Sequence, residues 1–264
     1  MNIHDILTYL AIIHEGNWDE IYKTIREKKV VLDEEIVKKE VNKLKCKSVT
    51  IMDEEYPEYL KEVCKPPFVL FYYGDISLLK DRDKHISVIG ARECSEYGVN
   101  ATKKIVKDLA SEYVIVSGLA KGIDRVAHET AINNGGKTIA VLGCGIDKCY
   151  PEENKDIYKI IKENHLLISE YPGKALVSSS QFPLRNRIVA HLSKCLVVTE
   201  AKMRSGTSIT VKFALCGGVD VCCVPYPVFE ESLCNALIKE GAALVESGND
   251  VIDEINTRAR KNIF

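Results

Sequence analysis

Residues 114–143, VIVSGLAKGIDRVAHETAINNGGKTIAVLG, contain two short apolar runs joined by a glycine-containing turn and a stretch of helical character. The runs at 114–118 and 138–143 are rich in Val and Ile and each ends at a glycine, which is typical of buried strands. Two strands joined through a helix run parallel when they share a sheet, because the crossover returns the chain to its starting edge. This stretch therefore predicts one β–α–β unit.

The same alternation continues on both sides of this unit. Further β-rich apolar runs occur at 86–90, 166–171, 195–200 and 219–224, and helical stretches separate most of them. Their continuous apolar character is typical of strands that are buried on both faces. The sequence therefore predicts an α/β fold with an extended, Rossmann-like, mainly parallel sheet and helices on both faces.

In the N-terminal part of the chain, the apolar residues are spaced differently. Apolar residues recur at helical spacing from Ile3 to Ile13 and again from Ile36 to Leu44, and Asp33 is placed to cap the later helix. Prolines 57, 66 and 67 then interrupt the pattern before the apolar run 68–73. We predict a small all-helical domain at residues 1–62 and a Rossmann-like domain at residues 63–264.

Composition and charge restrict the class of protein. The chain has 264 residues, 46% hydrophobic and 28% charged, and lacks the run of about 18 apolar residues that a membrane span needs. The first residues do not resemble a signal peptide, so we expect a cytoplasmic protein without a membrane partner. The net charge is only −2, yet residues 174–212 carry seven Lys or Arg, including Lys174, against the single acidic residue Glu200. This basic segment favours an anionic partner.

The ten cysteines do not form a metal-binding pattern. No Cys-x-x-Cys pair occurs, and Cys195, Cys222 and Cys223 lie in apolar runs where a reduced cysteine acts as a small hydrophobic residue. No Walker motif or histidine metal motif is present. We expect no metal and no cofactor.

The segments that follow the predicted strands carry most of the polar chemistry. Ligands of doubly wound sheets bind beyond the carboxyl ends of the strands, so these loops should lie along one edge. They include Gly90-Ala91-Arg92, the loop 117–124 with Lys121, a long loop ending in residues 181–187, and residues 200–208. Arg92 stands where a dinucleotide fingerprint needs its second glycine, which disfavours bound NAD.

Two of these segments suit a phosphate and a base. Ser205-Gly206-Thr207-Ser208 at the start of a helix offers backbone N–H groups and hydroxyls to a phosphate, although ordinary capping of the helix explains the segment equally well. The guanidinium groups of Arg92, Arg185, Arg187 and Arg204 favour the phosphate interpretation. Phe182 is suited to stack on a base or to anchor its loop.

Catalytic patterns are weak. Ser117 and His128 lack a nucleophile elbow, and Asp124 and Asp147 follow glycines, where a turn or capping role is more common. We therefore expect a binding protein without catalytic residues.

These loops, taken in order, resemble the DNA-processing protein A family, DprA/Smf. The resemblance runs from Asp53-Glu54-Glu55-Tyr56-Pro57 through Gly-Ala-Arg, Ser-Gly-Leu-Ala-Lys-Gly-Ile-Asp, Gly-Cys-Gly-Ile-Asp, Phe-Pro-Leu-Arg-Asn-Arg-Ile and Arg-Ser-Gly-Thr-Ser to about Gly241. It implies a cytoplasmic homodimer that binds single-stranded DNA without sequence preference and delivers it to the RecA recombinase during natural transformation. It also implies the strand-contacting residues, namely Arg92, Lys121, Phe182, Arg185, Asn186, Arg187, Arg204, Ser205, Gly206 and Thr207.

Two departures accompany the resemblance. Lys121 stands where the family more often has Arg, and from the few residues after Asp250 we expect no winged-helix domain of the kind that many members carry. Two alternatives remain open from the residues. One is a nucleotide phosphoribohydrolase of the lysine-decarboxylase-like family, although Ser208, Ile209 and Thr210 follow Thr207 where that family needs a Glu. The other is a module that senses mononucleotides.

Overall fold

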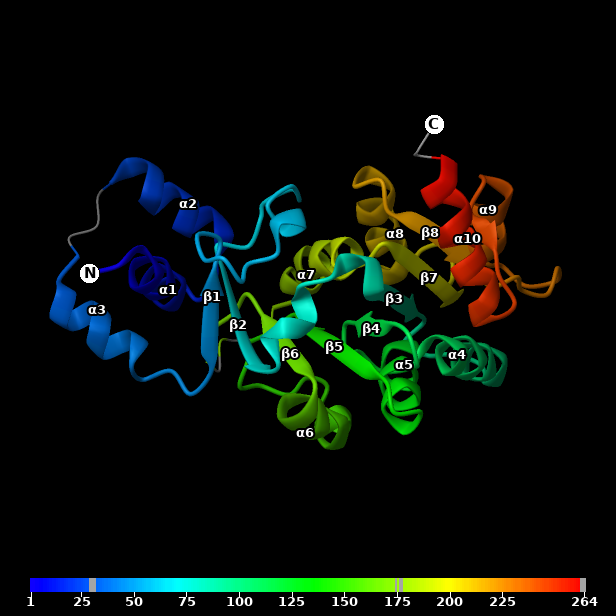
Figure 1. The fold of residues 1–264 in the computed structure, drawn as a ribbon, viewed down its shortest axis with the longest axis horizontal. Helices are drawn as coiled ribbons and strands as arrows, with labels where there is room; N and C mark the ends of the chain where they lie inside the picture. The colour runs from blue at the N-terminus through cyan, green and yellow to red at the C-terminus, as the bar shows by residue number, and fades with distance from the viewer. Residues whose placement is uncertain (29–31, 174, 176–177, 262–264) are drawn as a thin grey trace.

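A single nine-stranded sheet forms the centre of the molecule in the computed structural model, which describes residues 1–28, 32–173, 175 and 178–261 (Figure 1). The strand order is β1-β2-β6-β5-β4-β3-β7-β8-β9. The strands are β1 (Lys47–Thr50), β2 (Val69–Gly74), β3 (His85–Gly90), β4 (Val114–Ser117), β5 (Lys137–Leu142), β6 (Leu166–Ser169), β7 (Cys195–Glu200), β8 (Asp220–Cys223) and β9 (Ala243–Leu244).

The strands from β3 to β9 pair in parallel, whereas β1 and β2 are antiparallel to their neighbours. Each of the six strands predicted from apolar runs is present within two residues of its expected limits. The carboxyl ends of β3, β4, β5, β6 and β7 consequently lie along one edge of the sheet, which we call the carboxyl edge. The prediction of a mainly parallel, Rossmann-like α/β sheet is confirmed.

Helices cover both faces of the sheet. On one face, α7, α8 and α9 pack on side chains such as Val141, Leu196 and Val198. On the other face, α4, α5 and α10 pack on Val88 and Val197, and α1 and α6 pack beside them. Neighbouring residues of one strand enter opposite cores, which is why these strands are apolar throughout. The helices of this domain are α4 (Glu96–Leu109), α5 (Ile123–Asn133), α6 (Lys155–Asn164), α7 (Gln181–His191), α8 (Gly206–Cys216), α9 (Leu233–Lys239) and α10 (Gly248–Lys261).

The N-terminal segment is helical as predicted, and asparagine or aspartate side chains cap its helices. Asn2, Asn17 and Asp33 accept backbone N–H groups at the starts of α1 (Ile3–Ile13), α2 (Trp18–Glu27) and α3 (Glu34–Val41). Short 3-10 helices complete the described chain, namely η1 (Glu58–Leu60), η2 (Ile76–Leu79), η3 (Arg82–Lys84) and η4 (Glu152–Asn154).

Strand β1 lies inside the segment that the sequence predicted to be all-helical. It pairs with β2 through Val49 and Leu70 and extends the sheet by one strand. Four residues of the pattern KSVT are too short and too polar to show a strand period in the sequence. Leu7 and Leu10 of α1 share a core with Phe71 of β2, so α1 packs directly on this end of the sheet, and α3 packs on α1.

Residues 181–187 form the first turns of α7, although the sequence predicted a loop there. Pro183 and the polar neighbours suggested a break, but proline is tolerated in the first turn of a helix, where its missing N–H has no partner to lose. No helix in the described ranges is long and apolar enough to cross a membrane.

Candidate functional site

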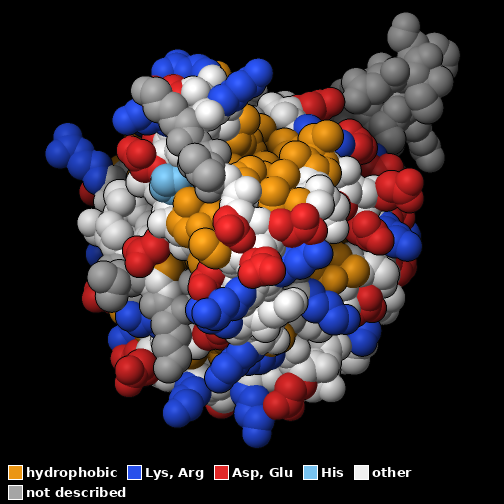
Figure 2. Space-filling model, turned by 90° about the vertical axis from the view of Figure 1, so that its left-hand side faces the viewer, with side chains coloured by type: hydrophobic (Ala, Val, Ile, Leu, Met, Phe, Trp, Pro, Cys, Tyr) orange, Lys and Arg blue, Asp and Glu red, His pale blue; other side chains and the backbone are white. Residues whose placement is uncertain are grey.

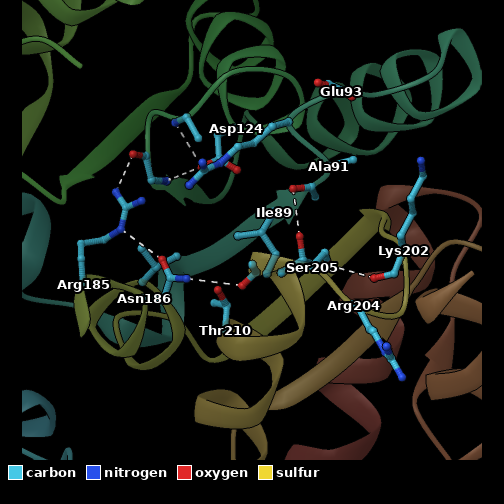
Figure 3. A pocket seen from close by; sticks show the side chains of 17 residues that line it. Ile89, Ala91, Glu93, Asp124, Arg185, Asn186, Lys202, Arg204, Ser205 and Thr210 are labelled. Atoms are coloured by element: carbon cyan, nitrogen blue, oxygen red, sulfur yellow. Dashed lines mark hydrogen bonds between the residues drawn. The ribbon is translucent and has the colours of Figure 1, made fainter. Parts of the chain in front are cut away.

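A cavity of about 380 Å³ opens at the carboxyl edge, between the loops that follow β3, β4 and β7 (Figure 3). Arg185 and Asn186 of α7 lie on one side of it, and Lys202 and Arg204 of the loop after β7 lie on the other. Residues from four separate parts of the chain therefore meet here because parallel strands end at the same edge.

The N-terminus of α8 faces this cavity without a side-chain cap. Ser205 stands at the N-cap, yet its hydroxyl donates to the carbonyl of Lys202 (2.8 Å), and no side chain among the described residues caps the helix. Thr207 donates its hydroxyl to the carbonyl of Gly90 (3.0 Å), which ties α8 to the end of β3. The N–H of Ser208 donates to the carbonyl of Ser205 (3.2 Å), whereas those of Gly206 and Thr207 remain available to an anion, so a side-chain cap does not explain this segment.

Exposed cations surround the helix terminus. The side chains of Arg92, Lys202 and Arg204 are exposed and line the cavity, and Glu93 and Asp124 are the acidic residues of its described lining. The guanidinium carbon of Arg92 lies 5.7 Å from the centre of the Phe182 ring. Such a set of exposed cations beside a helix N-terminus is suited to hold phosphate groups.

Arg185 also lines the cavity but is almost fully buried, with 4% of its surface exposed. It donates Nη1 to the carbonyls of Gly118 and Val141 and Nε to Oδ1 of Asn186 (3.2 Å). Its guanidinium lies so close to Gly118 that a Cβ there would come within 2.6 Å of Nη2. Arg185 thus connects the ends of β4 and β5 to α7 and holds one wall of the cavity in place.

Asp124 balances this buried cation. Its carboxylate accepts the N–H groups of Gly118 and Ala120, both at 3.2 Å, and shapes the turn after β4. Burial raises the pKa of Asp124, while the charge of Arg185 and the two N–H donors oppose that rise. The expectation that Asp124 fixes a turn is confirmed.

A smaller cavity of about 70 Å³ continues the site toward β5 and shares Arg92, Gly118 and Arg185 with the larger one. Phe182 and Tyr150 form its aromatic wall, with ring centres 5.5 Å apart. A Cβ at Gly143 would approach the Phe182 ring to 2.7 Å, so glycine is needed for this close contact. Lys121 lines the same cavity and forms an ion pair with Glu153.

Arg187 lies apart from both cavities. Its side chain is 1% exposed and donates to both oxygens of Glu170 at 2.6 Å. It also donates to the carbonyls of Lys65, Cys64 and Leu184. Burial disfavours the charged form, but the charge and hydrogen bonds of Glu170, together with the smaller effects of Tyr171 and Tyr56, outweigh burial and raise the pKa of Arg187. The observed contacts make Arg187 a connection between α7, the end of β6 and the segment before β2.

The structure brings together all the sequence-predicted site residues except Arg187. The larger cavity is lined by Arg92, Arg185, Asn186, Arg204, Ser205, Gly206 and Thr207, and the smaller one by Lys121 and Phe182. Lys174 of the basic segment lies outside the described residues. Sequence reasoning did not select Lys202, Tyr150 or Thr210 as site residues. The sequence feature that could have identified Tyr150 as a site residue is its position next to Pro151, in a loop that follows a predicted strand.

The residues weighed for catalysis or metal binding have structural contacts. Ser117 donates to the carbonyl of Val88 and His128 contacts the hydroxyl of Thr138, both in the buried core. Asp147 accepts the hydroxyl of Tyr73. Within the described part of the chain, no group of three or more His, Cys, Asp or Glu side chains is placed to hold a metal ion.

These features define a Rossmann-like protein whose carboxyl edge carries a cationic, partly aromatic pair of cavities. The family profile for DNA recombination-mediator protein A matches residues 47–256. The chain therefore belongs to this family, also called DprA/Smf, as the resemblance of its loops predicted.

Individual relatives agree with this assignment. DNA processing protein DprA of Streptococcus pneumoniae is 46% identical over 210 residues, which cover 78% of this chain and 73% of that protein. DprA of Bacillus subtilis is 35% identical over 214 residues, covering 80% of this chain and 72% of the relative.

Solved structures are similar over most of the chain. The crystal structure of S. pneumoniae DprA has a TM-score of 0.82 at 36% identity and covers 96% of this chain and 99% of its own. A structure describing the single-stranded DNA binding mode of DNA processing protein A from Helicobacter pylori has a TM-score of 0.71 at 28% identity. It covers 83% of this chain and 97% of its own.

Proposed function

We propose that this protein binds single-stranded DNA without sequence preference along the carboxyl edge. The observation that supports this proposal most is the cavity that Arg92, Arg204 and the uncapped N-terminus of α8 line together. Cations and N–H groups hold phosphates whatever the sequence, and Phe182 and Tyr150 offer ring faces to any base. The H. pylori relative, whose structure concerns single-stranded DNA binding, supports the same ligand.

The exposure of the side chains that line the cavities indicates which of them contact the DNA strand. Arg92 and Arg204 carry the phosphate contacts, and Phe182 carries a base contact. Arg185 and Asn186 form the wall of the cavity, and Ser205, Gly206 and Thr207 present the start of α8. Lys121 contributes once it leaves Glu153 for a phosphate. Arg187 acts indirectly, by holding α7 in place through Glu170.

We further propose a non-catalytic role, in which a cytoplasmic homodimer delivers the bound strand to a RecA-type recombinase during DNA uptake. Membership of the recombination-mediator family supports this role. The phosphoribohydrolase alternative has less support, because Glu200, the acidic residue that precedes α8 in sequence, accepts the N–H and hydroxyl of Ser95, the N-cap of α4. Stimulation of strand exchange by a RecA recombinase on strands precoated with single-strand binding protein tests the delivery role, and sedimentation equilibrium tests the dimer.

The binding proposal is tested by titrating labelled oligothymidylate and mixed-sequence strands at several salt concentrations. Arg92→Ala and Arg204→Ala should weaken both strands alike and each lower the slope of log affinity against log salt by about 0.7. Lys107→Ala is the matched control, since it removes an exposed charge in the last turn of α4, away from the cavities. Wild-type affinity in the Arg92/Arg204 double variant would refute the proposal.

A further inference from the structure

Three aromatic rings stack outside the two cavities, on the N-terminal part of the chain. The ring centres of Trp18 and Tyr22 are 5.0 Å apart with planes 12° from parallel, and those of Trp18 and Phe68 are 5.3 Å apart at 24°. The indole N–H of Trp18 donates to the carbonyl of Pro66 (2.7 Å) and fixes the middle ring. We call Trp18, Tyr22 and Phe68 the aromatic stack.

The stack is open to solvent at Tyr22, which is 46% exposed. Arg26 lies 5.9 Å from the centre of the Tyr22 ring, and Lys65 lies 5.3 Å from that of Trp18. Figure 2 faces the end of the molecule where α1, α2 and α3 lie, and it shows a hydrophobic patch among charged side chains. Ile25, on the same helix as Tyr22, is 40% exposed, so α2 presents aromatic and aliphatic surface that the described core does not cover.

Two contacts place the stack beside the carboxyl edge. Gly16, two residues before Trp18, lies so close to the end of β6 that a Cβ there would come within 2.5 Å of the Glu170 carbonyl. The carbonyl of Lys65 accepts Nε of Arg187 at 3.0 Å. Phe182 precedes Arg187 by five residues on α7, about 7.5 Å along the helix at 1.5 Å per residue.

We propose that the aromatic stack is a second contact for single-stranded DNA, where a base leaving the carboxyl edge stacks on Tyr22. This inference rests on the proposed function and extends its footprint onto the N-terminal helices. Aromatic faces bind bases without regard to sequence, and a flanking cation such as Arg26 is free to turn toward a phosphate. Asp19 pairs with Lys65 at 2.7 Å, so the contact depends mainly on stacking.

Strand length separates this contact from the cavities. Tyr22→Ala should weaken binding of a strand of about 20 nucleotides by about 5- to 10-fold. It should not change the affinity for a strand of about 5 nucleotides, which the cavities hold. The slope of log affinity against log salt should also stay the same. Tyr22→Phe should retain wild-type affinity because it keeps the ring. Ile25→Ala is the matched control on the same helix, because it removes exposed apolar surface without removing a ring.

Photocrosslinking supplies a direct readout. A long strand that carries 5-iodouracil should form adducts on Tyr22 or Trp18, which mass spectrometry of the digested protein identifies. Adducts confined to Phe182 and Tyr150, with equal affinity of wild type and Tyr22→Ala for the long strand, would overturn the inference and leave the proposed function intact. Self-association that is lost in both Tyr22→Ala and Ile25→Ala, with unchanged DNA affinity, would also overturn it in favour of a protein contact. Failure of the wild type to bind any strand would refute both.

Discussion

Replacing Arg187 by Met should unfold the protein more readily without removing a strand contact. The substitution leaves the Glu170 carboxylate, which is 6% exposed, without its ion-pair partner. Loss of one member of a buried pair costs about 3–5 kcal/mol of unfolding free energy. For a chain of this size, that loss lowers Tm by about 6–15 °C.

Urea unfolding followed by Trp fluorescence measures this cost, because Trp18 is the single tryptophan and contacts Pro66, next to Lys65. The double variant Arg187→Met/Glu170→Met should lose less unfolding free energy than the single variant, about 1–3 kcal/mol relative to wild type. In the double variant no buried charge is left unpaired, and only backbone carbonyls lose a donor. Where Arg187→Met is folded, its affinity for single strands should remain close to wild type. Wild-type stability together with an affinity loss equal to that of Arg92→Ala would refute the structural role of Arg187.

Two further predictions concern the core beside the site. His128 is fully buried, and burial lowers its pKa to about 3. Below pH 6.5 this histidine is protonated in the unfolded state but stays neutral in the folded state. The free energy of unfolding should therefore fall by about 1.4 kcal/mol for each pH unit between pH 6.5 and 3. His128→Asn should flatten the dependence of the unfolding free energy on pH in this range, as measured by urea unfolding. An unchanged slope would show that His128 does not cause this pH dependence. Gly118→Ala should destabilise by about 1–3 kcal/mol, because the guanidinium of Arg185 is held by two carbonyls and has no room to move. Gly206→Ala, whose Cβ meets nothing within 4 Å, is its control, and equal stability of the two variants would show that Gly118 is not constrained.

The sequence determined the fold class because the strands of a parallel sheet are local, continuous apolar runs. The runs at 86–90, 114–118, 138–143 and 195–200 coincide with β3, β4, β5 and β7 to within one residue. It also predicted that the loops after these strands meet, since parallel strands end at one edge. The start of α8 at Gly206 was readable from Ser205 and the glycine that follows it.

Tertiary structure alone decided which of the arginines face the cavities. Arg185 and Arg187 are two residues apart in one motif and have the same side chain, yet Arg185 lines the cavity whereas Arg187 is paired with Glu170. Residues two apart on a helix point in different directions, and residues 181–187 showed no helical period around Pro183. The partners of Arg187, from residues 64, 65 and 170, are distant in sequence, and local patterns carry no information about such contacts. The aromatic stack depends on tertiary structure for the same reason, because Trp18 lies on α2 and Phe68 stands directly before β2, far from it in sequence.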